Sequence, residues 1–200
     1  MAQLLLSPEN HIQRLNTILN KVDQLQNLGL TSLITPPNTK SWNILEVLVH
    51  LNIAYGHYQQ KFNQHIPKLP DAKSENEGFR IRRWQKMVVD SQRPKEGVRK
   101  WKMKTLKRFE PLLDQNQLSP EKAEEIFKTF MELHNHLKEA VLICRKKEVS
   151  QLKIPSAIGP VVRFYLPEAF EFLICHLERH MVQIDEILQQ QESLVSPQQP

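Results

Sequence analysis

Residues 41–51 read SWNILEVLVHL, and their apolar side chains recur at steps of three and four residues. This spacing predicts a helix with one buried face, and His50 stands among the apolar residues of that face. We expect Ser41 to cap the helix and the helix to end near Ile66, because Pro67 follows. The imidazole of His50 should therefore point toward the interior of the protein.

Three further segments show the same helical spacing, and the helices predicted from them cover residues 7–28, 118–147 and 167–191. The first two open with a serine followed by proline, at Ser7-Pro8 and Ser119-Pro120. A serine cap followed by proline at the first helical position is a typical start of a helix. Together with the helix at 41–66, these segments predict an all-α protein built as a four-helix bundle.

A long stretch, residues 67–117, separates the second and third predicted helices. Loops in helix bundles usually have only about two to eight residues. We expect this stretch to contain short helices, with 79–90 the best candidate, and to form a crossover that lets helices two and three run parallel. The whole chain, 1–200, is predicted as a single domain with a polar, frayed tail at 193–200.

The composition is that of an ordinary globular protein, with 40% hydrophobic and 24% charged residues. No segment approaches the roughly 20 apolar residues of a membrane span, and residues 1–6 are too short and uncharged for a signal peptide. We therefore expect no membrane partner and a cytoplasmic location. Cys144 and Cys175 each end a short apolar run, which favours buried reduced thiols, although a disulfide in oxidising surroundings stays open.

The net charge of +5 is concentrated in residues 80–108, which hold twelve Lys or Arg residues but only two acidic ones. Such a segment could contact nucleic acid or an anionic ligand, although a solvated basic surface is more common. Trp84 and Trp101 lie among these charges and could stack on bases or, more simply, pack the crossover against the bundle. No recognised nucleic-acid motif is present, so we do not expect a nucleic-acid partner.

Two of the eight histidines, His176 and His180, are four residues apart and lie on one face of the fourth predicted helix. His50 could supply a third nitrogen if the second helix faces the fourth across the bundle. Imidazole ligands suit zinc, nickel, iron or copper, and three histidines with an open position are typical of catalytic zinc. The spacing alone leaves open a pair of histidines that is merely hydrogen-bonded.

The five other histidines are not assigned to this site. His134 and His136 are two residues apart and point to different sides of their helix, and His57 lies two turns beyond His50. The excluded residues are His11, His57, His65, His134 and His136. No Ser-His-Asp or Cys-His arrangement stands out either, so the catalytic residues stay unassigned.

Residues 41–51 resemble the second-helix signature of the DinB-like superfamily, in which a Ser-Trp helix start precedes a ligand histidine that is followed by leucine. Residues 166–170, LPEAF, and 176–183, HLERHMVQ, resemble the last-helix pattern of that superfamily, namely a histidine, three residues, a second histidine and then glutamine. The similarity extends from about residue 7 to residue 187. It implies a four-helix bundle of the DinB/YfiT type, with His50, His176 and His180 as ligands of one divalent metal ion.

The resemblance also implies a function, because relatives with this bundle include thiol-dependent transferases that use bacillithiol or mycothiol and a maleylpyruvate isomerase. It implies a divalent-metal-dependent enzyme, and most specifically a thiol-dependent S-transferase. The expected cofactor is zinc or nickel, with iron or manganese as alternatives. The expected partners are a small-molecule substrate, such as a low-molecular-weight thiol, and a second copy of the chain in a homodimer.

The chain departs from some relatives at Val49, where they carry an acidic residue before the histidine. Glu46, one turn earlier, could orient the His50 ring or could be a plain surface carboxylate. Gln183 shares the face of His176 and His180 and could contact a ligand or bound water. Two alternatives to an enzyme stay open: a non-catalytic binding module that uses residues 80–108, and a structural relative that binds no metal.

Overall fold

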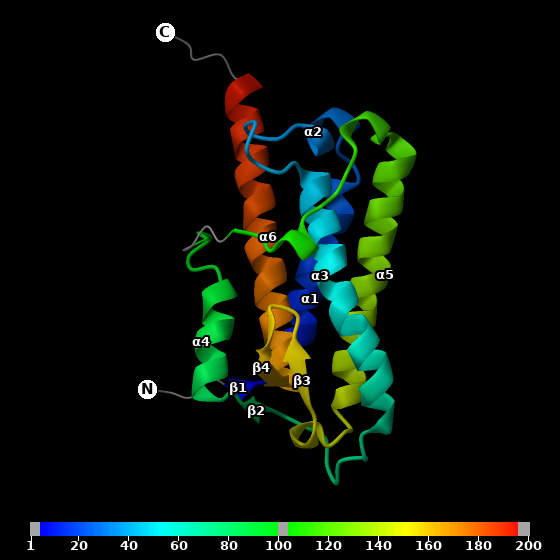
Figure 1. The fold of residues 1–200 in the computed structure, drawn as a ribbon, viewed down its shortest axis with the longest axis vertical. Helices are drawn as coiled ribbons and strands as arrows, with labels where there is room; N and C mark the ends of the chain where they lie inside the picture. Colours follow the sequence, from blue (N-terminus) through cyan, green and yellow to red (C-terminus); the bar gives the residue numbers. More distant parts are fainter. Residues whose placement is uncertain (1–4, 100–103, 196–200) are drawn as a thin grey trace.

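Four long helices form the frame of the computed structural model, which describes residues 5–99 and 104–195. They are α1 (Pro8–Leu25), α3 (Ile44–His65), α5 (Pro120–Cys144) and α6 (Leu166–Val195). α1 packs against α5 and α6, and α3 also packs against α5 and α6. The order around the bundle is therefore α3, α5, α1 and α6. Figure 1 shows α1 and α6 running in one direction and α3 and α5 in the other. The second and third long helices are therefore parallel, as the long crossover predicts.

The predicted caps of two long helices are confirmed. The Ser7 hydroxyl accepts a hydrogen bond from the Asn10 amide at the start of α1, and Ser119 accepts one from Lys122 at the start of α5. In each case the proline that follows the serine lies in the first turn. These contacts satisfy amide groups that have no partner within the helix.

The predicted cap of α3 is wrong, because Asn43 and not Ser41 occupies that position. The Asn43 side chain accepts from the Glu46 amide at 2.9 Å, and the Glu46 carboxylate accepts from the Asn43 amide at 2.8 Å. This reciprocal capping box satisfies two amides at once. The Ser41 hydroxyl instead donates to the side-chain oxygen of Asn38 in the preceding turn.

The apolar stripes of the long helices meet in one core, and the interior also encloses both cysteines. Cys144 and Cys175 are buried free thiols, as expected. Burial raises the pKa of each thiol to about 12. Both sulfurs are therefore protonated at neutral pH, whereas a reactive cysteine is a thiolate at that pH.

The crossover contains short elements that run along the outside of the bundle. They are η1 (Ile66–Lys68), β2 (Phe79–Arg80), α4 (Arg83–Gln92), η2 (Lys107–Phe109) and η3 (Gln115–Gln117), and α2 (Leu30–Ile34) connects α1 to α3. The helix predicted at 79–90 begins later because Phe79 and Arg80 pair with β1 (Leu5–Leu6). Figure 1 shows α4 beside α6, outside the four-helix frame.

A β-hairpin precedes α6, and the helical periodicity did not predict it. Its strands are β3 (Lys153–Ser156) and β4 (Gly159–Tyr165), preceded by the short helix η4 (Val149–Gln151). The hairpin is anchored because Ile154 and Phe164, which pair across it, are both buried in the core. The Tyr165 amide at its end donates to the Glu168 carboxylate at 2.9 Å, so α6 begins at Leu166.

Carboxylates of α6 engage several basic residues of the 80–108 segment. Arg82 pairs with Glu168, Arg93 with Glu171, and Arg99 with Glu186. Three of the twelve basic residues that the sequence places in this segment therefore fasten the crossover to the bundle. Trp84 on α4 is 46% exposed and packs only in part against its neighbours, and Trp101 lies outside the described residues.

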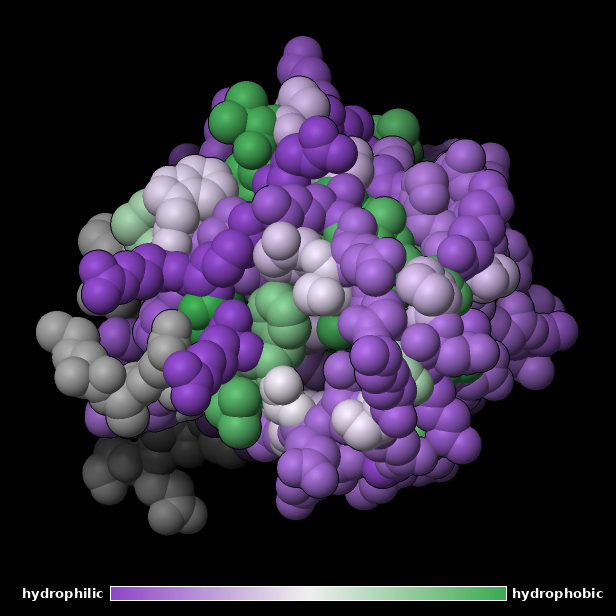
Figure 2. Space-filling view, turned by 90° about the horizontal axis from the view of Figure 1, so that it is seen from below, coloured by the Kyte–Doolittle hydropathy of each residue, from purple (hydrophilic) through white to green (hydrophobic). Residues whose placement is uncertain are grey.

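The surface at the end where α6 begins is mainly hydrophilic, with hydrophobic residues in small separate areas (Figure 2). Among the helices of the described part of the chain, none combines the length and apolarity needed to cross a bilayer. At the other end, α6 continues to Val195, into the tail that we expected to be frayed. Residues 196–200 lie outside the described part of the chain.

Candidate metal centre

Three histidine rings from two helices meet at the side of the bundle. His50 lies on α3, and His176 and His180 lie one turn apart on α6. The Nε2 atom of His176 is 3.3 Å from that of His50 and 3.1 Å from that of His180. All candidate ligand atoms of the trio lie within 4.8 Å of one another. The structure thus brings together the three residues that the sequence analysis predicted as metal ligands.

The separations between these nitrogens suit a single divalent ion. Zinc lies about 2.0–2.1 Å from each imidazole nitrogen, so two ligands at a tetrahedral angle are about 3.3 Å apart. The two measured separations, 3.3 and 3.1 Å, are close to this value. Three protein ligands also leave a fourth position for water or substrate, which is the arrangement of catalytic sites.

Hydrogen bonds on the outer nitrogens orient two of the rings. His50 Nδ1 donates to the backbone oxygen of Phe109 at 2.7 Å, and His180 Nδ1 donates to the side-chain oxygen of Gln183 at 3.0 Å. In this tautomer the Nε2 lone pair of each ring is directed into the cluster, as a metal ligand requires. The sequence left open whether Gln183 contacts a ligand or bound water or is simply solvated. In the structure Gln183 contacts the His180 ring and lines the pocket beside it.

Of the two roles that the sequence left open for Glu46, contact with the His50 ring is not the one that the structure shows. One carboxylate oxygen of Glu46 accepts from the Asn43 amide in the capping box, and the other accepts from Gln115. The carbonyl of Phe109 takes the role instead, from the short helix η2 in the crossover. Sequence patterns could not reveal this contact, because a backbone carbonyl is the same in every residue type.

Burial keeps the three imidazoles neutral at physiological pH. Desolvation is the main cause that lowers the pKa of His50, and it also lowers the pKa of His176 to about 3. The pKa of His180 falls well below its usual value, first through desolvation and then through repulsion by the other two rings. Only a neutral imidazole has a free lone pair for a metal, so each ring is in its ligating form.

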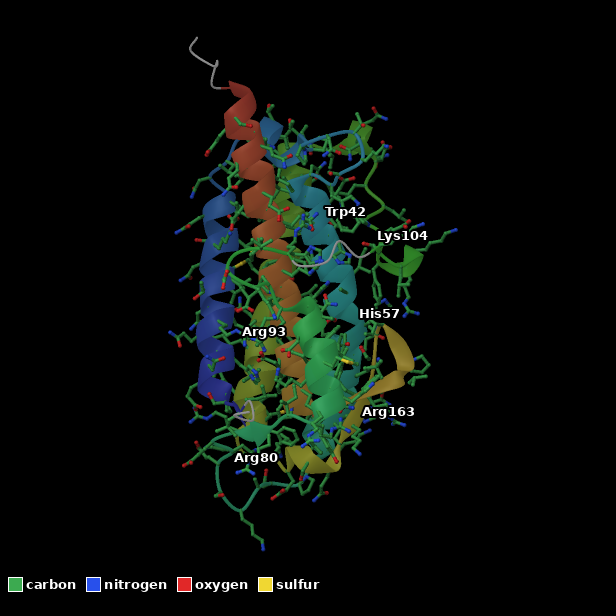
Figure 3. All side chains as sticks on the ribbon, turned by 90° about the vertical axis from the view of Figure 1, so that its left-hand side faces the viewer. Trp42, His57, Arg80, Arg93, Lys104 and Arg163 are labelled. Atoms are coloured by element: carbon green, nitrogen blue, oxygen red, sulfur yellow. The ribbon has the colours of Figure 1, made fainter. Side chains whose placement is uncertain are left out.

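The histidine cluster forms part of the wall of a pocket of about 520 Å³. The aromatic rings of Trp42 and Phe172 line the same pocket, and the centroid of the Trp42 ring is 5.0 Å from that of His50. Arg179 and Lys104 add positive charge to the lining. Figure 3 shows Trp42 and Lys104 on the same side of the bundle. A pocket of this size, lined by aromatic rings together with many polar and charged side chains, can hold a small molecule.

The other histidines have different surroundings, as the sequence analysis expected. His134 is buried and donates to the Phe130 carbonyl at 2.7 Å, and His57 is exposed beside the Phe109 ring. Among the described residues, none of the other five belongs to the cluster of side chains that could hold a metal ion. Sequence reasoning did not single out Arg179, although its position three residues after His176 on α6 was a usable signal.

No family model matches this chain, and no curated protein does. A solved structure is similar over most of its length: YfiT from Bacillus subtilis, described as "a probable metal-dependent hydrolase with an unusual four-helix bundle topology". The alignment covers 92% of this chain and 87% of YfiT, with a TM-score of 0.54 and 15% sequence identity. The likeness shows that this chain has the four-helix-bundle fold of the DinB/YfiT type, which confirms the predicted fold class.

Proposed function

We propose that this protein is a divalent-metal-dependent enzyme that acts on a small molecule, with His50, His176 and His180 as metal ligands. The observation that carries the proposal is the convergence of three imidazole Nε2 atoms, with separations of 3.1 and 3.3 Å, at the wall of a 520 Å³ pocket. Buried imidazoles that face one another without a cation are costly, and a bound ion removes that cost. The description of YfiT as metal-dependent supports the same reading.

The residues around the proposed metal have distinct tasks. A divalent ion held there, zinc or nickel with iron or manganese as alternatives, supplies the positive charge that acidifies a coordinating thiol or water. Phe109 and Gln183 hold two ligand rings in the ligating tautomer. Trp42 and Phe172 provide apolar walls that exclude water from the reacting groups.

The reaction we propose is transfer of a low-molecular-weight thiol to an electrophile. Both cysteines of the chain are buried, and burial raises their pKa to about 12, so neither serves as a nucleophile at neutral pH. The sulfur nucleophile must then come from a cosubstrate that enters the pocket. Hydrolysis is the second candidate, and the description of YfiT as a hydrolase favours it.

Metal analysis tests the ligand assignment. We expect the purified protein, reconstituted with zinc or nickel, to bind about one ion per chain. The variants His50→Ala, His176→Ala and His180→Ala should lose that ion while circular dichroism shows an intact helical fold. His57→Ala is the matched control, because His57 is an exposed histidine of α3 outside the cluster. Equal metal content in every variant would contradict the assignment, and a wild type that binds no metal would favour the structural relative.

A turnover assay separates the two reactions. The metal-loaded protein is incubated with a panel of electrophilic and ester substrates, with and without bacillithiol, mycothiol or glutathione. A transferase consumes substrate only when a thiol is present, whereas a hydrolase also consumes it in buffer alone. The His50→Ala variant should lose either activity. Turnover that persists in this variant would contradict the proposal.

Two further parts of the proposal, and one alternative to it, have separate measurements. The homodimer is tested by light scattering during size-exclusion chromatography, and the cytoplasmic location by fractionation of the source cells. The alternative of a nucleic-acid-binding module predicts DNA binding that weakens steeply with salt. Since Arg82, Arg93 and Arg99 pair with carboxylates of α6, we place that alternative behind both reactions.

A further inference from the structure

Arg179 is a buried cation that forms no ion pair with any carboxylate of the described residues. Only 5% of its surface is exposed, and its Nη1 atom is buried without a hydrogen-bond acceptor. Arg179 takes part in none of the ion pairs found among the described residues. A charged group in such surroundings is costly unless another charge and hydrogen bonds compensate it. The guanidinium therefore requires an explanation other than fold stability.

The neighbouring carboxylates of α6 are engaged elsewhere. Glu178 accepts from Arg14 Nε at 2.7 Å, and Glu186 accepts from Arg99 Nε at 3.1 Å. Each of these acidic side chains thus already has an arginine partner from another element. Glu186 therefore favours the Arg179 charge only through space, against the repulsion of Arg99, and the buried Nη1 group is left to donate to an acceptor from outside the chain.

Arg179 also lies where a ligand can reach it. It follows His176 by three residues and precedes His180 by one, and all three side chains line the same pocket. Lys104, an exposed residue, lines this pocket as well and makes its entrance more attractive to anions. A small molecule in this pocket can therefore contact the arginine and the histidine cluster together.

We propose that Arg179 binds a carboxylate group of the small molecule that occupies this pocket, so that the ligand is an organic anion. The guanidinium is planar and presents paired N–H donors that match a carboxylate. Lys40 and Lys104, which also line the pocket, are exposed, and Arg99 is already paired with Glu186. The Arg179 guanidinium is therefore the buried contact for one planar anionic group. The apolar rings of Trp42 and Phe172 suit the carbon chain of such a ligand. This anion site extends the proposed function. It depends on that function only for the part of the ligand, such as a thiol, that would coordinate the metal.

Two thiols of matched length test the proposal: 3-mercaptopropionate carries a carboxylate, and 3-mercapto-1-propanol carries a hydroxyl in its place. Binding of each to the metal-loaded and to the metal-free protein is measured by isothermal titration calorimetry and by tryptophan fluorescence, to which Trp42 in the pocket wall contributes. We expect the wild type to bind the carboxylate probe about tenfold tighter or more, as expected for hydrogen bonds to a charged group. Equal affinity for the two probes, or no saturable binding of the carboxylate probe, would overturn the proposal.

Substitution of the arginine tests whether this side chain provides the preference. Arg179→Gln should bind both probes alike, and Arg179→Lys should keep part of the preference because it retains the charge. The control is Arg83→Gln, which removes an exposed arginine of α4 that does not line the pocket. Arg179→Gln should also leave the melting temperature of the ligand-free protein unchanged or raised, since it removes an unpaired buried charge. A preference that survives in Arg179→Gln, or a lowered melting temperature in both Arg179 variants, would overturn the proposal.

The outcomes separate this proposal from the metal proposal. If Arg179→Gln and the wild type bind the same amount of metal and neither prefers the carboxylate, only the anion site fails. If the wild type binds no metal but the metal-free protein still prefers 3-mercaptopropionate through Arg179, only the metal proposal fails.

Discussion

Single contacts decide whether three histidines can act as one ligand set. A histidine ring can carry its proton on either nitrogen, and the group that accepts a hydrogen bond from Nδ1 fixes that choice. For His50 this group is the Phe109 carbonyl, and for His180 it is the side-chain oxygen of Gln183. Gln183 can be substituted without touching the cluster itself, whereas the backbone carbonyl cannot.

We predict that Gln183→Leu weakens metal binding by about 10- to 100-fold, because the His180 ring loses the acceptor that holds its tautomer and orientation. Leucine keeps a similar volume at this half-buried position, so the fold should persist. Competition with a chelator of known affinity measures the change. Gln189→Leu, at an exposed position of the same helix, is the control, and equal metal affinity of both variants would show that Gln183 does not orient the ring.

At the scale of the helix, the start of α3 sets the position of His50. The capping box between Asn43 and Glu46 fixes where the first turn begins. His50 lies less than two turns after that start. The position of the first turn therefore sets the direction in which the His50 side chain points. The sequence analysis placed the cap at Ser41 because serine is a common cap residue, but Asn43 is the residue that has Glu46 three positions later.

We predict that Asn43→Ala lowers the free energy of unfolding by roughly 1–2 kcal/mol, the usual cost of removing a helix cap. Ser41→Ala should change it by less than about 0.5 kcal/mol, as expected of a surface substitution. Urea denaturation followed by circular dichroism gives both values. Asn43→Asp, which keeps an acceptor oxygen, should recover most of the loss. A larger effect from Ser41→Ala than from Asn43→Ala would contradict the cap seen in the structure.

At the scale of the whole molecule, a buried ionic cluster ties three parts of the chain together. Glu171 on α6 is 2% exposed, and its carboxylate contacts His11 at 2.8 Å and Arg14 at 2.7 Å, both on α1. Arg93, which directly follows α4, completes the cluster (Figure 3). Burial alone would raise the pKa of Glu171, but the hydrogen bond from His11 and the charge of Arg14 outweigh it, so the pKa lies well below its usual value.

We predict that this cluster makes the fold sensitive to acid. Because the folded pKa of Glu171 is lowered, its contribution to stability is complete above the unfolded pKa of about 4.3 and declines as the pH falls further. Glu171→Gln should therefore cost roughly 3–5 kcal/mol near neutral pH, and its difference from the wild type should shrink below about pH 4. Urea denaturation of the metal-free proteins across this range measures the effect. Glu192→Gln, at an exposed position of α6, should show no such trend, and a difference for Glu171→Gln that is independent of pH would contradict the prediction.

Local patterns were sufficient for the four long helices and for part of the site. Helical periodicity and the serine-proline starts predicted the long helices, and the length of the crossover predicted that α3 and α5 run parallel. The spacing of His176 and His180 predicted that they share a face, since neighbours on one helix are fixed by the helix geometry. The apolar face of the second helix offered His50 as a third ligand, and the family resemblance supported that choice. That a metal ion binds there stays a prediction.

Contacts between distant segments were decided only in the tertiary structure. The meeting of His50 with His176, the Phe109 carbonyl behind His50, and the hairpin of β3 and β4 all join residues far apart in the chain. The same holds for Arg82, Arg93 and Arg99 of the crossover, which looked like part of a basic surface in the sequence and pair with carboxylates of α6 in the structure. The physical reason is range: a cap or a helical stripe depends on residues within a few positions, whereas the partner of a buried charge or ring depends on how whole helices pack.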